Sequence, residues 1–345
     1  GQTGGNYPII GNSVYSNTLG TQFIHKLNPT MDTTIFCTVF GSGNLQVNIS
    51  PSAFLVSNCG LIYISGWGGT VNQSGNTNNM PITSNAFQSN FEMGSTFKPI
   101  TAIMGYDLGI LNFNMKFDVT KKYLNISDHD KFKDKGIYDI EKIIVESSNI
   151  GTAQLATKIG KQNQINFFNK IGFYDRIELE NNESAHPLGN KNNWGRLETA
   201  TIGFGHGFSI TPLHLVKAYA TLANNGIEVY PNLNFKKNIE KKQILNNKNS
   251  SKLFLDLLNS VVLKTEYTGP RVKIKGYSIG GKTGTSELIN PLGGYYKDRN
   301  LTSFIGIFPI NDPKYVIYSA LEYPKKENGT KQKMTGARVN APLVK

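Results

Sequence analysis

The sequence predicts an α+β fold in which an antiparallel sheet is flanked by helices, preceded by a small all-β segment. Helix and strand patterns mix after residue 90, and three strand candidates follow one another near the end of the chain. Charge is nearly absent before residue 91, where Lys26 and Asp32 stand alone although the chain holds 36 basic and 24 acidic residues. We therefore expect two domains, 1–90 and 91–345, as a chain of 345 residues also favours.

The first ninety residues have the pattern of short strands separated by Gly, Asn, Ser and Thr. Apolar, β-prone runs occur at 33–40 and 61–65, with loop sequences such as GSGN and NQSGNTNN near them. Residues 60–88 resemble one copy of the short β-propeller repeat of bacterial secreted and surface proteins. A single repeat cannot bury its own face. We expect a repeat-like segment joined to the second domain, with a fusion as one explanation of the join.

Helix signals follow in order along the second domain. We expect helices after Ser95, from 139 to 144, over 151–160 and from Pro212 onward. The last is the clearest, because Thr211 suits the N-cap, Pro212 the first helical position and Gly226 the stop. Its apolar residues at helical spacing should face the core; they are Leu215, Ala218, Tyr219 and Leu222.

The strand candidates cover 276–287, 302–310 and 314–323. Asn311, Asp312 and Pro313 form a tight turn signal, so the last two strands should pair as an antiparallel hairpin. A central strand position mainly requires an apolar β-prone run. The run at 61–65 is therefore a candidate for an additional strand of this sheet.

Composition excludes several classes of protein. A net charge of +12 suggests nucleic-acid binding, but the basic residues are scattered or paired and form no Arg-rich run, so we expect none. A solvated basic surface that favours anionic partners explains the charge. Cys37 and Cys59 are too few for a disulfide scaffold and lack metal-site spacing; whether they pair is left open. The sequence contains no run of about 18 apolar residues, so we expect no membrane anchor in it. Residues 1–10 lack the pattern of a secretory signal.

The candidate catalytic residues lie in three short motifs, Ser95-x-x-Lys98, Ser147-Ser148-Asn149 and Lys282-Thr283-Gly284-Thr285. Ser95 and Lys98 are three residues apart at a helix start and share one face, which brings the amine within reach of the hydroxyl. A neutral lysine can take the serine proton. Burial and the second cation, Lys282, would both lower the pKa of Lys98 toward neutrality. Ser95 would then attack a carbonyl carbon and become acylated.

The remaining motif residues suit supporting roles. Backbone N–H groups of Ser95 and Thr285 are candidates for the oxyanion hole. Ser147 adds a hydroxyl for proton shuttling, and Asn149 an amide to hold the peptide group of the substrate. Lys282, Thr283 and Thr285 would bind a substrate carboxylate. The predicted substrate-binding run is therefore Thr283, Gly284 and Thr285, and the predicted catalytic residues are Ser95, Lys98, Ser147, Asn149 and Lys282.

The three motifs in this order are the signature of penicillin-binding proteins and class A β-lactamases. Residues 91–345 resemble the transpeptidase domain of a class B penicillin-binding protein, of the septal cell-division type. The resemblance rests on FEMGSTFKP at 91–99, SSNIGTAQLA at 147–156, the segment at 201–226 and GGKTGTSE at 280–287. The sequence WGRLETA at 194–200 favours the septal subgroup.

The resemblance implies a D,D-transpeptidase that cross-links peptidoglycan. Such enzymes acylate on the penultimate D-alanine of a stem peptide, release the terminal D-alanine and pass the acyl group to an amine of a neighbouring strand; β-lactams mimic that dipeptide. It implies no metal and no organic cofactor. The implied partners are stem peptides, β-lactams, and cell-division and glycan-polymerising proteins, and the implied location is the periplasmic face of the inner membrane. It also implies a fold that is incomplete at both ends.

Two alternatives belong to other classes. One is a hydrolase of the same fold, a β-lactamase or D,D-carboxypeptidase; no motif supplies a dedicated deacylating glutamate, and 201–226 matches transpeptidases better. The other is an inactive fusion fragment. His206, between two glycines, suits a general base, but a structural or rim position is preferred because Lys98 takes that role. Ser147 and Asn149 also suit helix capping.

Overall fold

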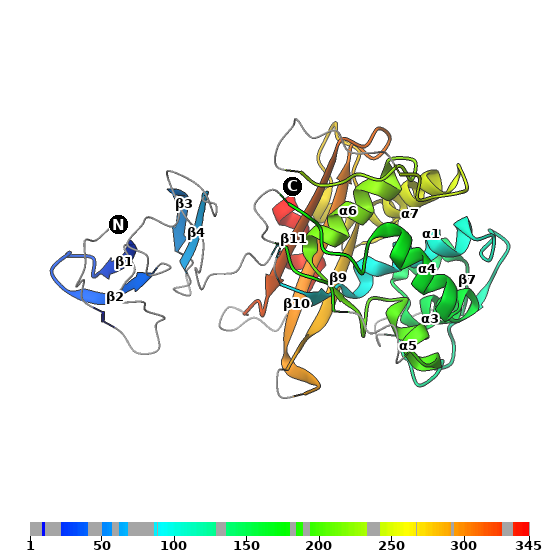
Figure 1. Cartoon of the computed structure of the whole chain (residues 1–345), viewed down its shortest axis with the longest axis horizontal. Helices are drawn as coiled ribbons and strands as arrows, with labels where there is room; N and C mark the ends of the chain where they lie inside the picture. The colour runs from blue at the N-terminus through cyan, green and yellow to red at the C-terminus, as the bar shows by residue number, and fades with distance from the viewer. Residues whose placement is uncertain are drawn as a thin grey trace. The chain divides into compact units, whose positions relative to one another are not determined.

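The computed structural model describes residues 9–10, 22–40, 50–56, 62–67, 86–87, 89–128, 136–179, 184–188, 194–232, 242–266, 268–290, 293–325 and 334–344. The chain divides into two compact units, 1–84 and 85–345 (Figure 1). Within the described ranges, no helix has both the length and the apolar character needed to cross a bilayer.

The described residues of the first unit form two antiparallel strand pairs. Strand β1 (Gln22–Leu27) pairs with β2 (Thr34–Phe40), which confirms the strand predicted at 33–40, and β3 (Ser50–Val56) pairs with β4 (Ile62–Trp67). Cys37 of β2 is buried, whereas Cys59 lies outside the described residues. The run at 61–65 therefore does not act as a strand of the sheet in the second unit, because β4 pairs with β3.

The second unit is built on an antiparallel sheet in the order β11-β10-β9. Its strands are β9 (Gly280–Ile289), β10 (Tyr295–Phe308) and β11 (Tyr315–Glu322), and the predicted β10–β11 hairpin is confirmed. Strand β9 begins later than predicted because a turn closes before it, where the Tyr277 N–H donates to the Ile274 carbonyl at 3.1 Å. Strand β10 begins earlier than predicted, since its first residues are two half-buried tyrosines followed by exposed charged residues, which show no apolar alternation.

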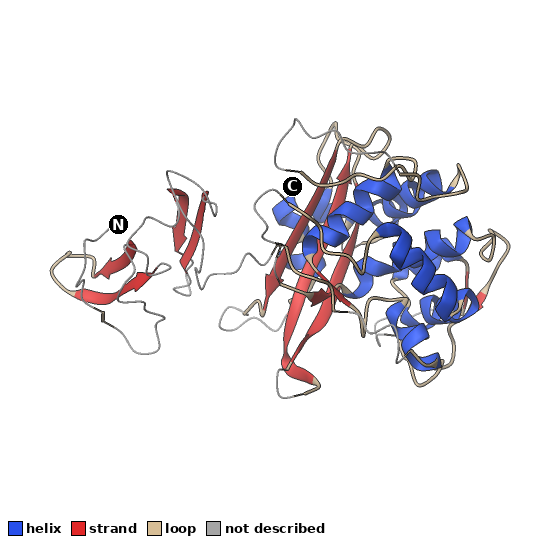
Figure 2. Ribbon diagram, in the orientation of Figure 1, coloured by secondary structure: helices blue, strands red, loops and turns tan. Residues whose placement is uncertain are grey.

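Helices pack on both faces of this sheet (Figure 2). Ile305 and Ile307 of β10 join the main core with residues of α1 (Lys98–Asp107), α6 (Pro212–Ala223) and α7 (Ser250–Lys264). Phe304 points to the opposite face, as period-2 alternation requires. There it packs in a smaller cluster with residues of α7, α8 (Gly269–Val272) and η2 (Ala341–Val344), beside α9 (Gly336–Val339).

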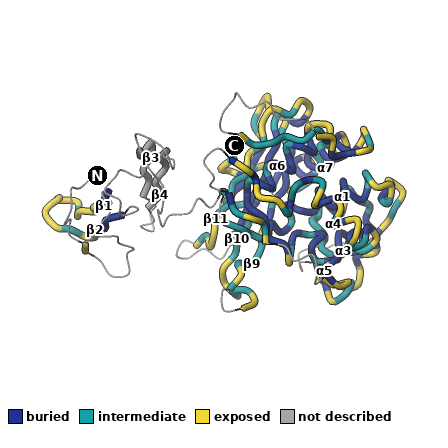
Figure 3. The backbone as a smooth tube through the Cα atoms, viewed as in Figure 1, coloured by how far each residue is buried: buried dark blue, intermediate teal, exposed yellow. Residues whose placement is uncertain are grey.

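Helix α6 confirms its sequence signals. The Thr211 hydroxyl accepts the His214 N–H, which caps the helix, and Pro212 is its first residue. The four apolar residues predicted to face the core are fully buried, in keeping with the buried interior seen in Figure 3. The helix ends at Ala223, before Gly226, which adopts a φ of 72° in the turn that follows.

Four further α-helices complete the described part of the second unit. They are α2 (Ile140–Glu146), α3 (Asn149–Ile159), α4 (Lys161–Ile171) and α5 (Arg196–Ile202), and the first two confirm the helices predicted near 139–144 and 151–160. Helix α3 packs against both α1 and α5. Short antiparallel pairs join the segments between helices: β5 (Phe91–Glu92) with β8 (Ser209–Ile210), and β6 (Phe117–Asp118) with β7 (Ile137–Tyr138).

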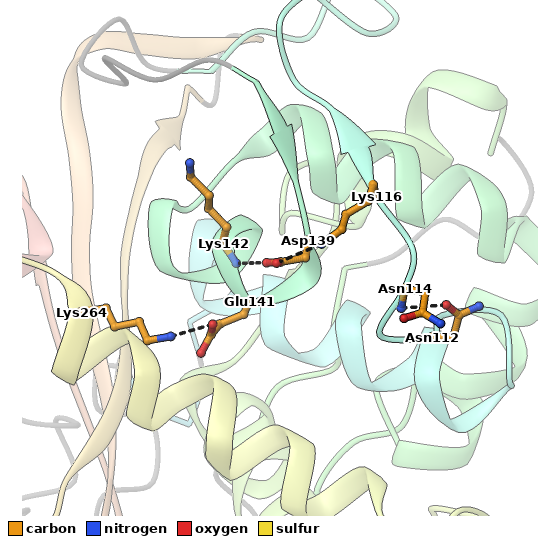
Figure 4. A network of polar contacts seen from close by, with 7 residues as sticks. All are labelled: Asn112, Asn114, Lys116, Asp139, Glu141, Lys142 and Lys264. Atoms are coloured by element: carbon orange, nitrogen blue, oxygen red, sulfur yellow. Dashed lines mark hydrogen bonds and ion pairs between the residues drawn. The ribbon is translucent and has the colours of Figure 1, made fainter.

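A polar network fixes helix α2, the helix that leads to Ser147 (Figure 4). The Asp139 carboxylate caps α2 by accepting the Lys142 N–H at 2.9 Å, and it also accepts from Lys116. Glu141 in the first turn binds Lys264 of α7 at 2.7 Å. Each exposed ion pair contributes little to stability by itself. Together with the cap, however, these contacts set the position of α2 against α7.

Candidate active site

Ser95 lies on η1 (Gly94–Phe97), a short 3₁₀ helix that runs directly into α1. The next turn starts at once, since the Lys98 N–H donates to the Ser95 carbonyl. Phe97 anchors this segment in an aromatic cluster, with its ring centroid 5.5 Å from that of Phe168 and 5.6 Å from that of Phe173. Ser95 itself is half-buried. The nucleophile candidate is thus an accessible residue on a rigidly packed turn.

Strand β9 packs closely against η1 because its residue 284 is glycine. A Cβ at Gly284 would lie 2.4 Å from Ser303 Oγ and 3.0 Å from Thr96 Cγ2. The first distance is shorter than real Cβ contacts and the second is tighter than most, so a side chain here would require the Ser303 side chain of β10 to move and η1 to give way slightly. This contact lays the Lys282–Thr285 run of β9 along the turn that carries Ser95.

Members of all three motifs meet at Ser147. Ser147 ends α2 in the left-handed conformation, with a φ of 59°. Its hydroxyl oxygen accepts from Lys282 Nζ at 2.9 Å and from Lys98 Nζ at 3.1 Å. Lys98 Nζ also donates to the Ser147 carbonyl. Two amines from distant parts of the chain therefore share one hydroxyl.

Burial shifts the pKa of both amines. Lys98 has 0% of its surface exposed and Lys282 has 1%. Removing an ammonium group from water disfavours its charged form. Burial, followed by the charge of Lys282, holds the pKa of Lys98 well below its usual range, with Asp128 acting in the opposite direction. Burial lowers the pKa of Lys282 to about 7. Proton loss from this pair is thus possible near neutral pH.

The structure adds a partner to one local expectation and corrects another. The Lys98 amine binds Ser147, and no hydrogen bond joins it to the Ser95 hydroxyl among the described contacts. The cap of α3 is Ser148, whose hydroxyl accepts the Gly151 N–H at 3.0 Å, whereas Ser147 closes α2 and Asn149 is the first residue of α3.

The other predicted residues lie around this centre but do not all touch it. Asn149 Nδ2 donates to the Ser127 carbonyl at 3.4 Å and is half-buried. Thr283 is half-buried and Thr285 is exposed, on the part of β9 that runs beside η1. A Cβ at Gly94 would lie 3.1 Å from the Thr285 carbonyl oxygen. The predicted oxyanion donors, on Ser95 and Thr285, thus belong to two elements in direct contact.

Asp128 is a site residue that the sequence motifs did not reveal. Its carboxylate is buried and accepts from the residues directly after Ser147. The chain offers three aspartates close together, at positions 128, 130 and 134, without helical or strand periodicity. The signal was therefore present, but nothing in the pattern distinguishes one of these carboxylates from the others.

His206 belongs to a second polar group beside Ser95. Its Nδ1 lies 3.0 Å from Glu92 Oε2, and its ring stacks on Tyr295 at 4.8 Å. Glu92 also accepts from the Tyr295 hydroxyl and the Gly207 N–H, both at 2.8 Å. The hydrogen bond with Glu92 raises the pKa of His206. These contacts favour the structural or rim position that we preferred for His206.

The family profile described as the penicillin binding protein transpeptidase domain matches residues 65–344. This match covers most of the chain and begins before residue 91. It takes in most of the segment that we compared to a β-propeller repeat, and that resemblance has no support. Most of 60–88 lies outside the described residues.

Two curated relatives illustrate the similarity in sequence. A probable peptidoglycan D,D-transpeptidase FtsI from Caulobacter vibrioides is 32% identical over 79% of this chain and 48% of its own length. Stage V sporulation protein D from Bacillus subtilis is 30% identical over 74% of this chain and 41% of its own length. The chain thus spans about half the length of the curated relatives it matches.

Solved structures show the same fold. The transpeptidase domain of penicillin-binding protein 3 from Burkholderia pseudomallei aligns with a TM-score of 0.65 at 24% identity, covering 75% of this chain and 78% of that one. Penicillin-binding protein 3 from Mycobacterium tuberculosis, complexed with ampicillin, aligns with a TM-score of 0.66 at 24% identity, covering 78% of this chain and 63% of that one.

Proposed function

This chain belongs to the penicillin-binding protein transpeptidase family, as a class B, FtsI-like member, and from that premise we propose that it is a serine D,D-transpeptidase that cross-links peptidoglycan stem peptides. One observation carries the proposal. Lys98 and Lys282, both buried, converge on the Ser147 hydroxyl next to the turn that carries Ser95. A buried amine with a lowered pKa is the base that serine activation needs.

In the proposed acylation, Ser95 Oγ attacks the carbonyl carbon of the penultimate D-alanine. Lys98 in its neutral form takes the hydroxyl proton. The carbon–nitrogen bond to the terminal D-alanine then breaks, and Ser147 relays the proton to the leaving amine. Because Ser147 bonds to both lysines, proton transfer among the three groups requires no large movement. The developing oxyanion would accept from the N–H groups of Ser95 and Thr285.

In the second half of the reaction an amine of a neighbouring stem peptide attacks the ester carbon. The bond between that carbon and Ser95 Oγ breaks, and the serine regains its proton. Asn149 would hold the peptide group of the substrate. Thr283, Thr285 and the Lys282 charge would bind its terminal carboxylate, with Gly284 leaving room for the approach of η1.

A septal role is the finer part of the proposal. FtsI-named relatives support it, as does the WGRLETA segment at 194–200. On the same basis we propose action at the periplasmic face of the inner membrane, beside cell-division and glycan-polymerising proteins. β-Lactams would acylate Ser95, since a related protein is known in complex with ampicillin.

Intact mass spectrometry after incubation with benzylpenicillin tests the assignment. The full chain should gain the mass of one penicillin, and the Ser95→Ala variant should gain none, because the ester needs the serine oxygen. Labelling of both proteins would reject Ser95 as the nucleophile. An adduct on the full chain that hydrolyses within seconds, with turnover of a chromogenic cephalosporin, would instead favour the hydrolase.

A further inference from the structure

Asp128 is a buried carboxylate that lies outside the three motifs. It is 7% exposed, and its two oxygens contact three consecutive residues. Oδ2 accepts the Ser148 hydroxyl at 2.6 Å, and Oδ1 accepts the N–H groups of Asn149 at 2.5 Å and Ile150 at 3.0 Å. These are the residues that directly follow Ser147. Asp128 therefore holds the chain at the position next to the shared hydroxyl.

The contacts also complete the start of α3. The first N–H groups of a helix have no partners within the helix, and a negative charge is favourable there. Asp128 satisfies two of them, and Ser148 Oγ satisfies a third by accepting the Gly151 N–H at 3.0 Å. Ser147 is consequently fixed from both sides, by the end of α2 and by this carboxylate-bound start of α3.

Charge gives Asp128 a second relation to the site. Lys98 faces one cation, Lys282 on β9, and one anion, Asp128; its remaining close partner is the uncharged Ser147. The carboxylate raises the pKa of Lys98, against the larger effects of burial and of Lys282. Paired buried charges are tolerated far better than isolated ones.

We propose that Asp128 is a positioning residue for acylation of Ser95, which fixes Ser147 beneath the two amines and balances their charge. The inference rests on the proposed function, because acylation is its readout. Asp128 touches neither the nucleophile nor, in the proposed mechanism, the substrate. Its effect passes through Ser147 and Lys98.

The pH profile of acylation by a fluorescent penicillin, measured on the full chain from pH 5 to 10, tests the proposal. The second-order rate constant reports the ionisation of the free enzyme. In Asp128→Asn the positive charge of the amines loses its counter-charge, so the neutral base appears at lower pH. The acid limb of the profile is the part in which the rate rises with pH, and it reports proton loss from the coupled lysine pair. We expect this limb to move to lower pH by about 1 unit. The maximal rate should fall by about 10-fold to 100-fold, since Ser147 is no longer held in place.

Two variants separate charge from position. Ser148→Ala keeps the carboxylate and removes its 2.6 Å link, so the rate should fall while the acid limb stays in place. Asp107→Asn is the matched control. Asp107 likewise accepts two backbone N–H groups, from Asn246 at 2.9 Å and Asn247 at 2.8 Å, but it is not among the charges that act on Lys98. The pH profile of acylation of Asp107→Asn should match that of the parent chain.

An acid limb that stays in place or moves to higher pH in Asp128→Asn would overturn the proposal, whatever the rate. Should that variant not fold, Asp128→Glu keeps the charge with a longer reach. It should acylate more slowly with the limb in place, and an unchanged rate would overturn the positioning role. Absence of any adduct on the parent chain would instead refute the proposed function, so the two failures are distinguishable.

Discussion

The two buried lysines carry a cost to folding that depends on pH. Burial lowers the pKa of Lys282 to about 7, while the unfolded chain keeps the ordinary lysine value. Between those two values the unfolded state binds more protons, so stability rises with pH across this window. Below pH 7 the folded protein holds a charged, buried Lys282 at full cost.

Lys282→Met should therefore stabilise the fold more at pH 6 than at pH 9. Methionine fills a similar volume without a charge to desolvate. The measurement is urea denaturation at both pH values, compared with the exposed control Lys252→Met, whose side chain is 76% exposed. An equal gain at both pH values would show that burial of the charge does not set the stability of this position.

The sequence motifs name candidate site residues, but they do not say which of those residues are hydrogen-bonded to one another. Spacing of three along a helix tells us that Ser95 and Lys98 share a face. It does not tell us that the amine turns toward Ser147, because that depends on where α2 ends. Ser147 and Ser148 are adjacent and chemically identical, so no pattern shows which of them caps α3.

Among the elements, the contact of η1 with β9 and with the 203–207 turn depends on glycine. The Gly94 N–H donates to the Gly205 carbonyl at 3.0 Å. Gly205 adopts a φ of 79°, and a Cβ there would lie 2.3 Å from the Gly94 carbonyl oxygen. The close approach is to backbone, which cannot rotate away as a side chain can.

Gly205→Ala should consequently lower the free energy of unfolding by about 3 kcal/mol or more and slow acylation by displacing Ser95. Gly276→Ala is the control, since Gly276 also has a positive φ, of 87°, but open space around its Cβ position. It should lose only about 1 kcal/mol from backbone strain. Chemical denaturation and penicillin labelling measure both effects; equal losses in the two variants would contradict the steric argument.

Elements bounded by a cap or turn signal were predicted well, whereas two elements without such a boundary were missed or shortened. Helix α6 has both a cap and a proline start, and the β10–β11 hairpin has a clear turn. The start of β10 offers no alternation to detect, because two half-buried tyrosines are followed by the exposed charged residues Lys297, Asp298 and Arg299. Helix α7 was not predicted, although its apolar residues Leu253, Leu257 and Val261 recur at helical spacing and made it detectable.

For the molecule as a whole, the site joins the helical and the sheet parts of the second unit. Ser95 belongs to the turn before α1, Lys282 to β9 and Ser147 to the junction of α2 and α3. A ligand bound across these segments is bound only when the unit is folded. Because the ligand binds the folded state and not the unfolded state, its binding stabilises the folded protein.

Benzylpenicillin should raise the midpoint of thermal unfolding of the full chain, by about 2–4 °C for each kcal/mol of added stability. Ser95→Ala should show no such rise, because it forms no ester. Differential scanning fluorimetry with and without the drug provides the comparison. A rise of equal size in the variant would point to binding that does not involve the serine.

The boundary near residue 90 stays a prediction. Charge begins to accumulate after that point, the compact units divide after Ser84, and the family profile begins at residue 65. These landmarks differ because each reports a different property. Charge reflects solvated surface, whereas contact density reflects packing, and surface composition need not change where packing does.

The charge states of the two lysines determine the direction in which the Ser147 hydroxyl hydrogen can point. A hydroxyl has two lone pairs and a single hydrogen. While both ammonium groups donate to Ser147 Oγ, at 2.9 and 3.1 Å, its lone pairs are filled and its hydrogen must point to a third direction. When one amine loses its proton, that nitrogen becomes an acceptor and the hydrogen can swing back to it. In the proposed mechanism, rotation about one carbon–oxygen bond would therefore direct the Ser147 hydrogen away from the lysines while both amines are charged, and back toward an amine once that amine is neutral.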